Sequence, residues 1–452
     1  MSGVLSCLFA AFVIYNALVI IYRLYFSPLA KIPGPKIAAA TPWYETFIDL
    51  WYNNFPDVLA NMHKKYGPIV RVTPWEISIN DPDYYNEVYV TAGRRRTNFD
   101  AGPRSGLGMQ DAISITEDHD THEMRRKAVA NFFSRQNVTR VESRIHNEAR
   151  LLDAKLHKLK GTGTIVPLDH AFTAFTGDLV GQFTCGENPQ LVEGPDFTPQ
   201  WHKSLYSVLD VVPLFRHIGW LSYLAKFVPV SLLKALYPEV AGFRMFTLMG
   251  EDQIDKIKME VSREAEKEST EKKQSVFHDI LRSELPPSEK DSGRLKREAT
   301  LSLITYFILA DPEVEKRLRE ELKGTACGFP EVVPRWADLE KLPYLQGCIK
   351  EGLRIGRFFR RNTRIAPDPD RWIGDYDPRM NRNFVPFTKG SRNCLGMNLA
   401  WSELYVCIAT LFRPGAHNMS LAGTEESDMV PIFDSDVGVP KRDSKGLNIR
   451  FN

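Results

Sequence analysis

Hydrophobic and polar positions divide the chain into an apolar start, two short alternating segments and a long region of helical periodicity. Val4 to Tyr22 is nearly all apolar. A helix is predicted at 58–66, and alternating residues at 68–73 and 76–80 predict two short strands. From about residue 120 to 325, apolar residues recur mostly at helical spacing. The pattern therefore predicts a mainly α protein with small β-sheets. The loop 186–199 and the charged run 261–275, read as a solvated helix face and loop, interrupt the helical region.

The apolar start is long enough to cross a membrane. Its 19 residues span about 28 Å at 1.5 Å per residue. Basic residues follow it (Arg23, Lys31 and Lys36) and none precedes it, so the remaining chain is expected on the cytosolic side. A cleaved signal peptide is the alternative, but it would start with basic residues and carry a shorter apolar run. We therefore predict a membrane anchor at 1–26, a proline-rich hinge at 27–36 that is not helical throughout, and one large domain at 37–452.

Composition narrows the class of protein. Hydrophobic residues make up 43% and charged residues 25% of the chain, which is typical of a globular domain with a sizeable core. The net charge of +2 gives no indication of nucleic-acid binding. The cysteines lack paired spacing, which favours reduced thiols over a disulfide framework. They are Cys7, Cys185, Cys327, Cys348, Cys394 and Cys407.

One cysteine lies in a segment with the features of a thiolate ligand. Residues 387–396 read Phe-Thr-Lys-Gly-Ser-Arg-Asn-Cys-Leu-Gly, and a segment of helical periodicity, 397–412, follows. Glycines at 390 and 396 permit close approach of the backbone to sulfur, and a helix N-terminus stabilises a thiolate. Arg392 adds a permanent cation suited to pairing with a carboxylate. The alternative is a buried structural cysteine beside a glycine turn.

The fixed positions Phe387, Gly390, Arg392, Cys394 and Gly396 form F-x-x-G-x-R-x-C-x-G, which resembles the signature of the cytochrome P450 family of haem-thiolate monooxygenases. The resemblance implies the cytochrome P450 fold and Cys394 as axial ligand of a haem iron, where thiolate donation favours O–O cleavage. It also implies insertion of one oxygen atom from dioxygen into an apolar small molecule, with electrons from an NADPH-dependent reductase. The expected location is the endoplasmic reticulum membrane, single-pass, with the catalytic domain in the cytosol. The chain looks most similar to fungal secondary-metabolite members, which suggests terpenoid or aromatic oxidation.

Three further segments resemble motifs of the family. His122-Glu-Met-Arg-Arg126 stands where the family has Trp-x-x-x-Arg, so His122 and Arg126 are expected to contact the haem; a basic surface helix is the alternative. Glu351 and Arg354 are three residues apart and can pair on one helix face. Pro369-Asp-Arg-Trp372 supplies Arg371, which by resemblance completes a structural triad of Glu351, Arg354 and Arg371 that locks the segment carrying the cysteine.

Two family features are missing. The family's oxygen-activating helix carries Ala/Gly-Gly-x-Asp/Glu-Thr, yet residues 295–310 contain no glycine and no acid–threonine pair in mid-helix. Thr300, in Glu298-Ala-Thr300, is the nearest candidate for a proton relay. Only 16 residues separate Arg354 from Arg371, where the family has a much longer stretch. We infer two internal deletions, near 295–310 and 355–371, which suggest skipped exons, an erroneous gene model or a degenerate gene.

These gaps leave three functional hypotheses. The first is a working membrane-anchored monooxygenase. The second is a haem-thiolate isomerase or peroxygenase, which needs no acid–alcohol pair because its substrate brings peroxide oxygen. The third is a catalytically impaired remnant that lacks the oxygen-activation motif, with or without haem.

Overall fold

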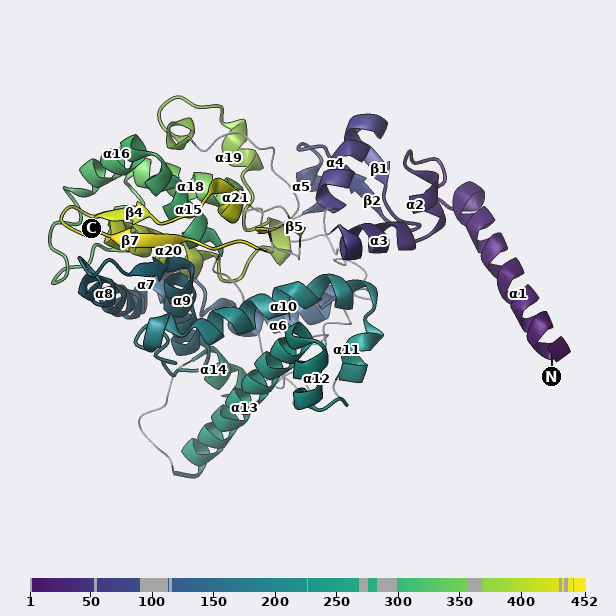
Figure 1. Ribbon diagram of the computed structural model, residues 1–452, viewed down its shortest axis with the longest axis horizontal. Coiled ribbons are helices and arrows are strands. Elements are labelled where there is room, and N and C mark those ends of the chain that lie inside the picture. Colours follow the sequence, from purple (N-terminus) through teal and green to yellow (C-terminus); the bar gives the residue numbers. More distant parts are fainter. Residues whose placement is uncertain are drawn as a thin grey trace. The chain divides into compact units, whose positions relative to one another are not determined.

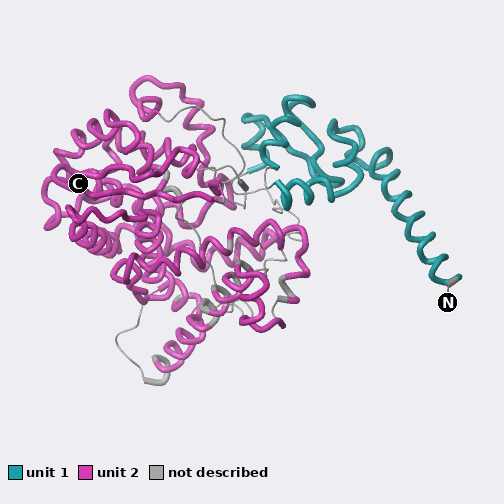
Figure 2. The backbone as a smooth tube through the Cα atoms, viewed as in Figure 1, with its two compact units in different colours: residues 1–90, 433–435 teal, residues 91–432, 436–452 magenta. Residues whose placement is uncertain are grey.

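The computed structural model describes residues 2–52, 55–89, 113, 116–225, 227–267, 275–282, 299–355, 368–430, 433–434, 438–441 and 443–452. By compactness the chain divides into residues 1–90 with 433–435, and residues 91–432 with 436–452 (Figure 2). Each unit has a hydrophobic core of its own. The architecture is mainly α with small sheets, as the hydrophobic pattern predicted.

The first unit begins with a long apolar helix (Figure 1). The helical segment Gly3–Phe26 has the length and composition of a membrane span, although a signal sequence would meet the same criteria, and its central residues are exposed. The anchor therefore remains a prediction. The elements of this unit are α1 Ser2–Ile21, the π-helix η1 Tyr22–Phe26, α2 Lys36–Ala40, α3 Trp43–Trp51, α4 Phe55–Tyr66, β1 Ile69–Arg71, β2 Ile77–Ile79 and α5 Tyr85–Val88, and β5 Phe433–Asp434 groups with them.

The predicted helix at 58–66 and the two predicted strands are confirmed. β1 and β2 pair antiparallel with Val70 opposite Ser78. The segment between η1 and α2 consists of turns and bends, as its prolines require. Arg71 is 1% exposed and holds this segment, since its main-chain N–H donates to the carbonyl oxygen of Pro33 at 2.8 Å and its guanidinium donates to that of Arg23, just before the segment, at 2.8 Å. The chain leaving the apolar helix is thereby fixed to the first sheet.

The second unit is built mostly from helices, shown in Figure 1. The helices are α6 His119–Ala130, α7 Arg135–Arg140, α8 Glu142–Lys158, α9 Leu168–Thr184, η3 Pro195–Phe197, α10 Pro199–His217, α11 Trp220–Ala225, α12 Val230–Leu236, α13 Pro238–Lys267, α14 Val276–Arg282, α15 Ala299–Ala310, α16 Pro312–Leu322, α17 Trp336–Leu339, α18 Pro343–Ile355, η5 Pro369–Trp372, α19 Arg379–Asn383, η6 Gly390–Arg392, α20 Met397–Phe412 and α21 Glu426–Met429. The strands are β3 Ile165–Pro167, β4 Met419–Leu421, β6 Gly438–Val439 and β7 Asn448–Phe451.

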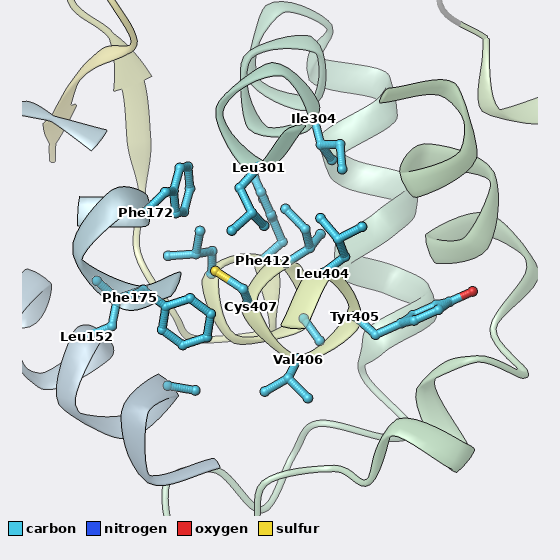
Figure 3. Close-up of a cluster of buried hydrophobic side chains, with 14 of the residues drawn as sticks. Leu152, Phe172, Phe175, Leu301, Ile304, Leu404, Tyr405, Val406, Cys407 and Phe412 are labelled. Atoms are coloured by element: carbon cyan, nitrogen blue, oxygen red, sulfur yellow. The ribbon is translucent and has the colours of Figure 1, made fainter. Parts of the chain in front are cut away.

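Helix α20 forms the centre of the larger core, as Figure 3 shows. Its residues Leu404 to Phe412 are buried on every face, so the segment reads as almost continuously apolar. Leu152 of α8, Phe172 and Phe175 of α9, and Leu301 and Ile304 of α15 belong to the same cluster. A three-stranded antiparallel sheet with β7 between β3 and β4 lies in the same unit. Because α20 begins just after Cys394, this core fixes the position of the cysteine loop.

Some predicted segments fall partly outside the described residues. The loop 186–199 contains turns and the short helix η3, and it ends where α10 begins. Helix α13 continues into the charged run as far as Lys267, and residues 268–274 are outside the described part. The same holds for 283–298 and 356–367, which overlap the two places, near 295–310 and 355–371, where we inferred deletions.

Two buried carboxyl groups pin the loop after α9. Asp178 is completely buried and accepts hydrogen bonds from the main-chain N–H groups of Leu191 and Val192 at 2.8 and 2.9 Å. Glu148, 1% exposed, hydrogen-bonds to Asp178 and accepts from Nε2 of Gln182 at 3.2 Å. Burial, followed by the charge of Asp178, raises the pKa of Glu148 to about 8. The carboxyl pair therefore holds a proton more tightly in the folded protein than in the unfolded chain.

This pair predicts a loss of stability with rising pH. The folded state holds the Glu148 proton more tightly than the unfolded state, whose pKa is near 4.5. The contribution is complete below that value and is lost as pH rises through 8, by about 2–4 kcal/mol. Urea unfolding at a series of pH values should show this fall in wild type and in the exposed control Glu331→Gln, but not in Glu148→Gln. An equal fall in Glu148→Gln would contradict the assignment.

Candidate functional site

The cysteine segment folds as a tight loop directly before α20. The N–H of Cys394 donates to the carbonyl oxygen of Phe387 at 2.9 Å, and the N–H of Asn393 donates to that of Gly390 at 3.1 Å. Gly390 has a φ of +77°, a conformation that favours glycine. Gly396 is the N-cap of α20 and accepts from the N–H of Ala400 at 2.9 Å. The half-buried Cys394 side chain therefore lies two residues before the positive end of a core helix.

Side chains outside the loop hold it in place. Phe387 is buried, and its ring centroid lies 5.6 Å from that of Trp401 in α20. Asn398, in the first turn of α20, donates from Nδ2 to the carbonyl oxygen of Phe133 at 2.8 Å. These contacts join the cysteine loop to α20 and to the segment that follows α6.

Two arginines meet beside the cysteine. Arg126 of α6 donates from Nη1 to the carbonyl oxygen of Asn393 at 2.8 Å and from Nη2 to its Oδ1 at 2.5 Å. Arg392 donates to the carbonyl oxygens of Thr116 at 2.5 Å and Glu117 at 3.0 Å. Burial lowers the pKa of Arg126, against the opposing effect of Cys394. Burial also lowers the pKa of Arg392, opposed by Asp118, and the charge of Arg126 adds to the lowering.

The two guanidinium groups have capacity for an anion. Within the described part of the chain, neither forms an ion pair of 4 Å or less, and the buried Nε of Arg392 has no hydrogen-bond partner. Partly buried like charges are unfavourable unless a counter-charge lies near them. A haem brings two carboxylates, and Cys394 next to these arginines can serve as a thiolate ligand to its iron. The residues present therefore fit the haem that the sequence resemblance implies.

His122 lies on the same helix as Arg126. It is 3% exposed and stands one turn before Arg126 in α6, whose N-cap Asp118 accepts from the N–H of Thr121 at 2.7 Å. Contact between His122 and haem stays a prediction. The sequence analysis did not single out Asn393, although this residue connects Arg126 to the loop. The position of Asn393 between Arg392 and Cys394 could have indicated this role.

The predicted triad residues come together around one buried carboxylate. Glu351, 3% exposed, accepts from Nε and Nη2 of Arg354 at 3.0 and 2.8 Å, and Arg371 lies 3.7 Å away. The structure adds two donors that the sequence analysis missed. Nε1 of Trp372 donates to Glu351 at 2.6 Å and the N–H of Asp368 donates to it at 3.1 Å. Glu351 is therefore the common acceptor that fixes the segment 368–372 to α18.

Close packing also holds the segment 368–372 against α18. A Cβ at Gly347 of α18 would come within 2.6 Å of the carbonyl oxygen of Pro369, so only glycine allows this approach. Asp370 accepts two hydrogen bonds from Arg317 of α16, at 2.5 and 2.6 Å. The segment that leads towards the cysteine loop is thus held by both α16 and α18.

The candidate for the proton relay is only partly described. Thr300 lies in the first turn of α15, but its side chain and the whole of Glu298 are outside the described residues. The rest of α15 packs into the core, where Ile304 fills the space that a Cβ at Gly352 of α18 would need. A role of Thr300 in proton transfer therefore stays a prediction.

Comparison with known proteins identifies relatives over nearly the whole chain. The family profile described as cytochrome P450 matches residues 36–293, 298–377 and 367–429. Cytochrome P450 monooxygenase sdnH of Sordaria araneosa is 41% identical, covering 97% of this chain and 93% of the relative. Stellatic acid synthase of Emericella variicolor is 35% identical over 99% and 95%. Fusicoccadiene C-8 hydroxylase of Phomopsis amygdali is 36% identical over 95% and 93%.

These comparisons agree with two internal deletions. The alignment with sdnH has 509 positions, whereas the chain has 452 residues, so at least 57 positions (509 minus 452) hold a residue only in the relative. The family match breaks between 293 and 298 and begins again within 367–377. The first break overlaps the start of residues 295–310, and the second lies at the end of the stretch between Arg354 and Arg371, which are the two places where we inferred deletions.

Proposed function

Since the chain belongs to the cytochrome P450 family of haem-thiolate monooxygenases, we propose that Cys394 is the axial ligand of its haem and that Arg126 and Arg392 bind the haem propionates. The observation that carries this proposal is the pair of partly buried guanidinium groups beside the cysteine loop, which form no ion pair with a carboxylate among the described residues. The bound haem would supply the iron at which oxygen is activated. Cys394 would hold a negative charge at the start of α20, the two arginines would orient and neutralise the carboxylates, and the Glu351 cluster would keep the loop in position.

We propose that the reaction is insertion of one oxygen atom into an apolar small molecule of fungal secondary metabolism. Relatives named as a fusicoccadiene C-8 hydroxylase and a stellatic acid synthase support this substrate class. P450 monooxygenases use a reductase as redox partner, and an NADPH-dependent reductase is the proposed donor here. The apolar segment Gly3–Phe26, with Arg23 near its end, supports anchoring in the endoplasmic reticulum membrane with the catalytic domain in the cytosol.

A second candidate function is favoured by the shortened segments. Because at least 57 positions of a relative have no counterpart here and one break adjoins α15, proton delivery to dioxygen is the step most exposed to loss. A chain impaired in that step could still bind haem and use a peroxide as its oxygen source. We therefore keep a peroxide-using haem-thiolate enzyme, or an impaired remnant, as the alternative.

Turnover with two oxygen sources separates these functions. The full chain is assayed in lipid vesicles with fusicoccadiene, first with reductase, NADPH and isotopically labelled dioxygen, then with an organic hydroperoxide alone; Cys394→Ser is the control. We expect a singly oxygenated product that carries the label from dioxygen. Product only with the hydroperoxide would favour the peroxide-using alternative. Haem-loaded protein inactive towards a panel of apolar substrates in both assays would identify a remnant.

Replacing Arg126 with methionine should weaken haem binding. The variant loses one charge-assisted hydrogen bond to a haem carboxylate, worth roughly 1.5–3 kcal/mol, and the two bonds to Asn393. Haem transfer to apomyoglobin should therefore become about 10–100-fold more favourable. The control Arg135→Met removes an exposed arginine paired with Glu340 and should leave haem transfer unchanged. Equal retention of haem by Arg126→Met and wild type would exclude Arg126 from the haem site.

A further inference from the structure

A second cluster of metal-ligating side chains lies away from the cysteine loop in sequence, where α9 and α10 begin. Asp169 and His170 occupy the first turn of α9, and His202 lies in the first turn of α10. One ligand atom from each of the three residues lies within 4.8 Å of the other two. Nε2 of His202 is 3.7 Å from Oδ2 of Asp169, and both side chains retain some exposure, 14% and 16%. The cluster is partly buried and still accessible to an ion.

The donors and acceptors around His202 determine which ring nitrogen carries the proton. The hydroxyl of Thr173 has a single proton, which it donates to the carbonyl oxygen of Asp169 at 2.7 Å. The contact of 2.8 Å between this hydroxyl and Nδ1 of His202 then requires the ring to be the donor. Nε2 is left with a lone pair beside the carboxylate oxygen. A metal-binding histidine has this arrangement, with one nitrogen donating to a protein oxygen and the other free for the ion.

Other polar atoms of the cluster are buried without a partner. Oδ1 of Asp169 and Nδ1 of His170 are inaccessible to solvent and form no hydrogen bond with the described residues. Buried polar atoms of this kind are costly unless something binds them. Two such atoms within one three-residue cluster are therefore available to bind an ion.

The neighbouring turn leaves room for the carboxylate. Gly446 has a φ of +67°, a backbone conformation that favours glycine. A Cβ at this position would also lie only 2.3 Å from Oδ2 of Asp169, so a larger residue would clash with the carboxylate. The N–H of Leu168 donates to the carbonyl oxygen of Leu447 at 2.7 Å and fixes this turn against the start of α9. The position of Asp169 is therefore set by the backbone around it.

We propose that Asp169, His170 and His202 form a binding site for a divalent transition-metal ion of the zinc type. Two imidazoles and one carboxylate suit zinc, whereas calcium and magnesium prefer all-oxygen sites. Tetrahedral ligands at about 2.05 Å from zinc are about 3.4 Å apart, so the 3.7 Å pair must close by only a few tenths of an ångström. Water would complete the coordination. The ion would join α9 to α10 and thereby stabilise the second unit.

Zinc uptake by the full haem-loaded chain tests the site. Dialysis against EDTA removes loosely bound metals and leaves the haem iron, after which the protein is equilibrated with zinc and the metal content is measured. We expect one zinc per chain and a zinc-dependent rise in Tm, because an ion that binds only the folded state stabilises it. Asp169→Asn and His202→Ala should each lose both effects. Thr173→Val, which removes the hydroxyl's contacts with the His202 ring and with the carbonyl oxygen of Asp169 but none of the three ligands, should weaken zinc binding about 10–100-fold.

The exposed histidine His157 provides the control, since His157→Ala should bind zinc as wild type does. Failure of wild type to retain zinc would overturn the proposal. Equal uptake by wild type, Asp169→Asn and His202→Ala would also overturn it, because the zinc would then sit on other surface histidines. If either variant fails to fold, His170→Gln and Thr173→Val give the same comparison.

Discussion

Cys394→Ser is expected to abolish the thiolate-type Soret band that carbon monoxide produces with the reduced, haem-loaded protein. A serine hydroxyl remains protonated and does not supply the electron donation of a thiolate. The loop offers no replacement, because Cys394 is the one cysteine in residues 387–396. Oxygenation of any substrate should be lost with the band. The measurement is the difference spectrum of purified variant and wild type at equal haem content.

The control for this experiment is Cys185→Ser, at a half-buried cysteine after α9 in the same unit, which should keep the band. A thiolate-type band in Cys394→Ser would mean that another cysteine binds the iron. The other candidates in the core are poor, since burial raises the pKa of both the Cys348 and the Cys407 thiols. Persistence of the band would therefore contradict the proposed site directly.

Glu351→Gln is expected to cause the second large effect, a loss of about 3 kcal/mol in the free energy of unfolding. The substitution removes the buried negative charge that Arg354 and Arg371 share at residue 351, and it weakens the hydrogen bond from Trp372. Removing one partner of a buried ion pair costs more than the pair itself contributes, because the remaining charge stays desolvated. Urea unfolding of variant and wild type measures the difference.

Glu340→Gln is the matched control, since its pair with Arg135 is largely exposed and should contribute about 1 kcal/mol or less. Similar losses in Glu351→Gln and Glu340→Gln would show that the buried cluster does not fix the segment 368–372. Glu351→Gln should also lower the amount of haem bound, because that segment leads to the cysteine loop. Glu340→Gln should leave haem content unchanged.

Local sequence patterns predicted the elements on which the site depends. Helix α20 follows from a continuous apolar periodicity, and the β1–β2 pair follows from two alternating segments. The Glu351–Arg354 pair follows from i, i+3 spacing on one helix face. These features involve neighbours along the chain, so the sequence contains them without knowledge of the tertiary structure.

Contacts between distant residues could not be predicted in the same way. Arg126 donates a hydrogen bond to Asn393, which lies 267 residues later in the chain. Glu351 accepts hydrogen bonds from Trp372 and from the main-chain N–H of Asp368, both in a different segment. His202 joins Asp169 only because α9 and α10 pack together. Such contacts depend on tertiary packing, and no spacing rule marks them. Arg371 was placed in its cluster by family resemblance.

The measurement that tests the central claim most directly is the carbon monoxide difference spectrum of the purified wild-type chain, together with its haem content. A haem-thiolate site built from Cys394, Arg126 and Arg392 predicts one haem per chain and a thiolate-type Soret band, in spite of the two shortened segments. Well-folded protein that binds no haem, or that gives the band of a neutral axial ligand, would contradict it.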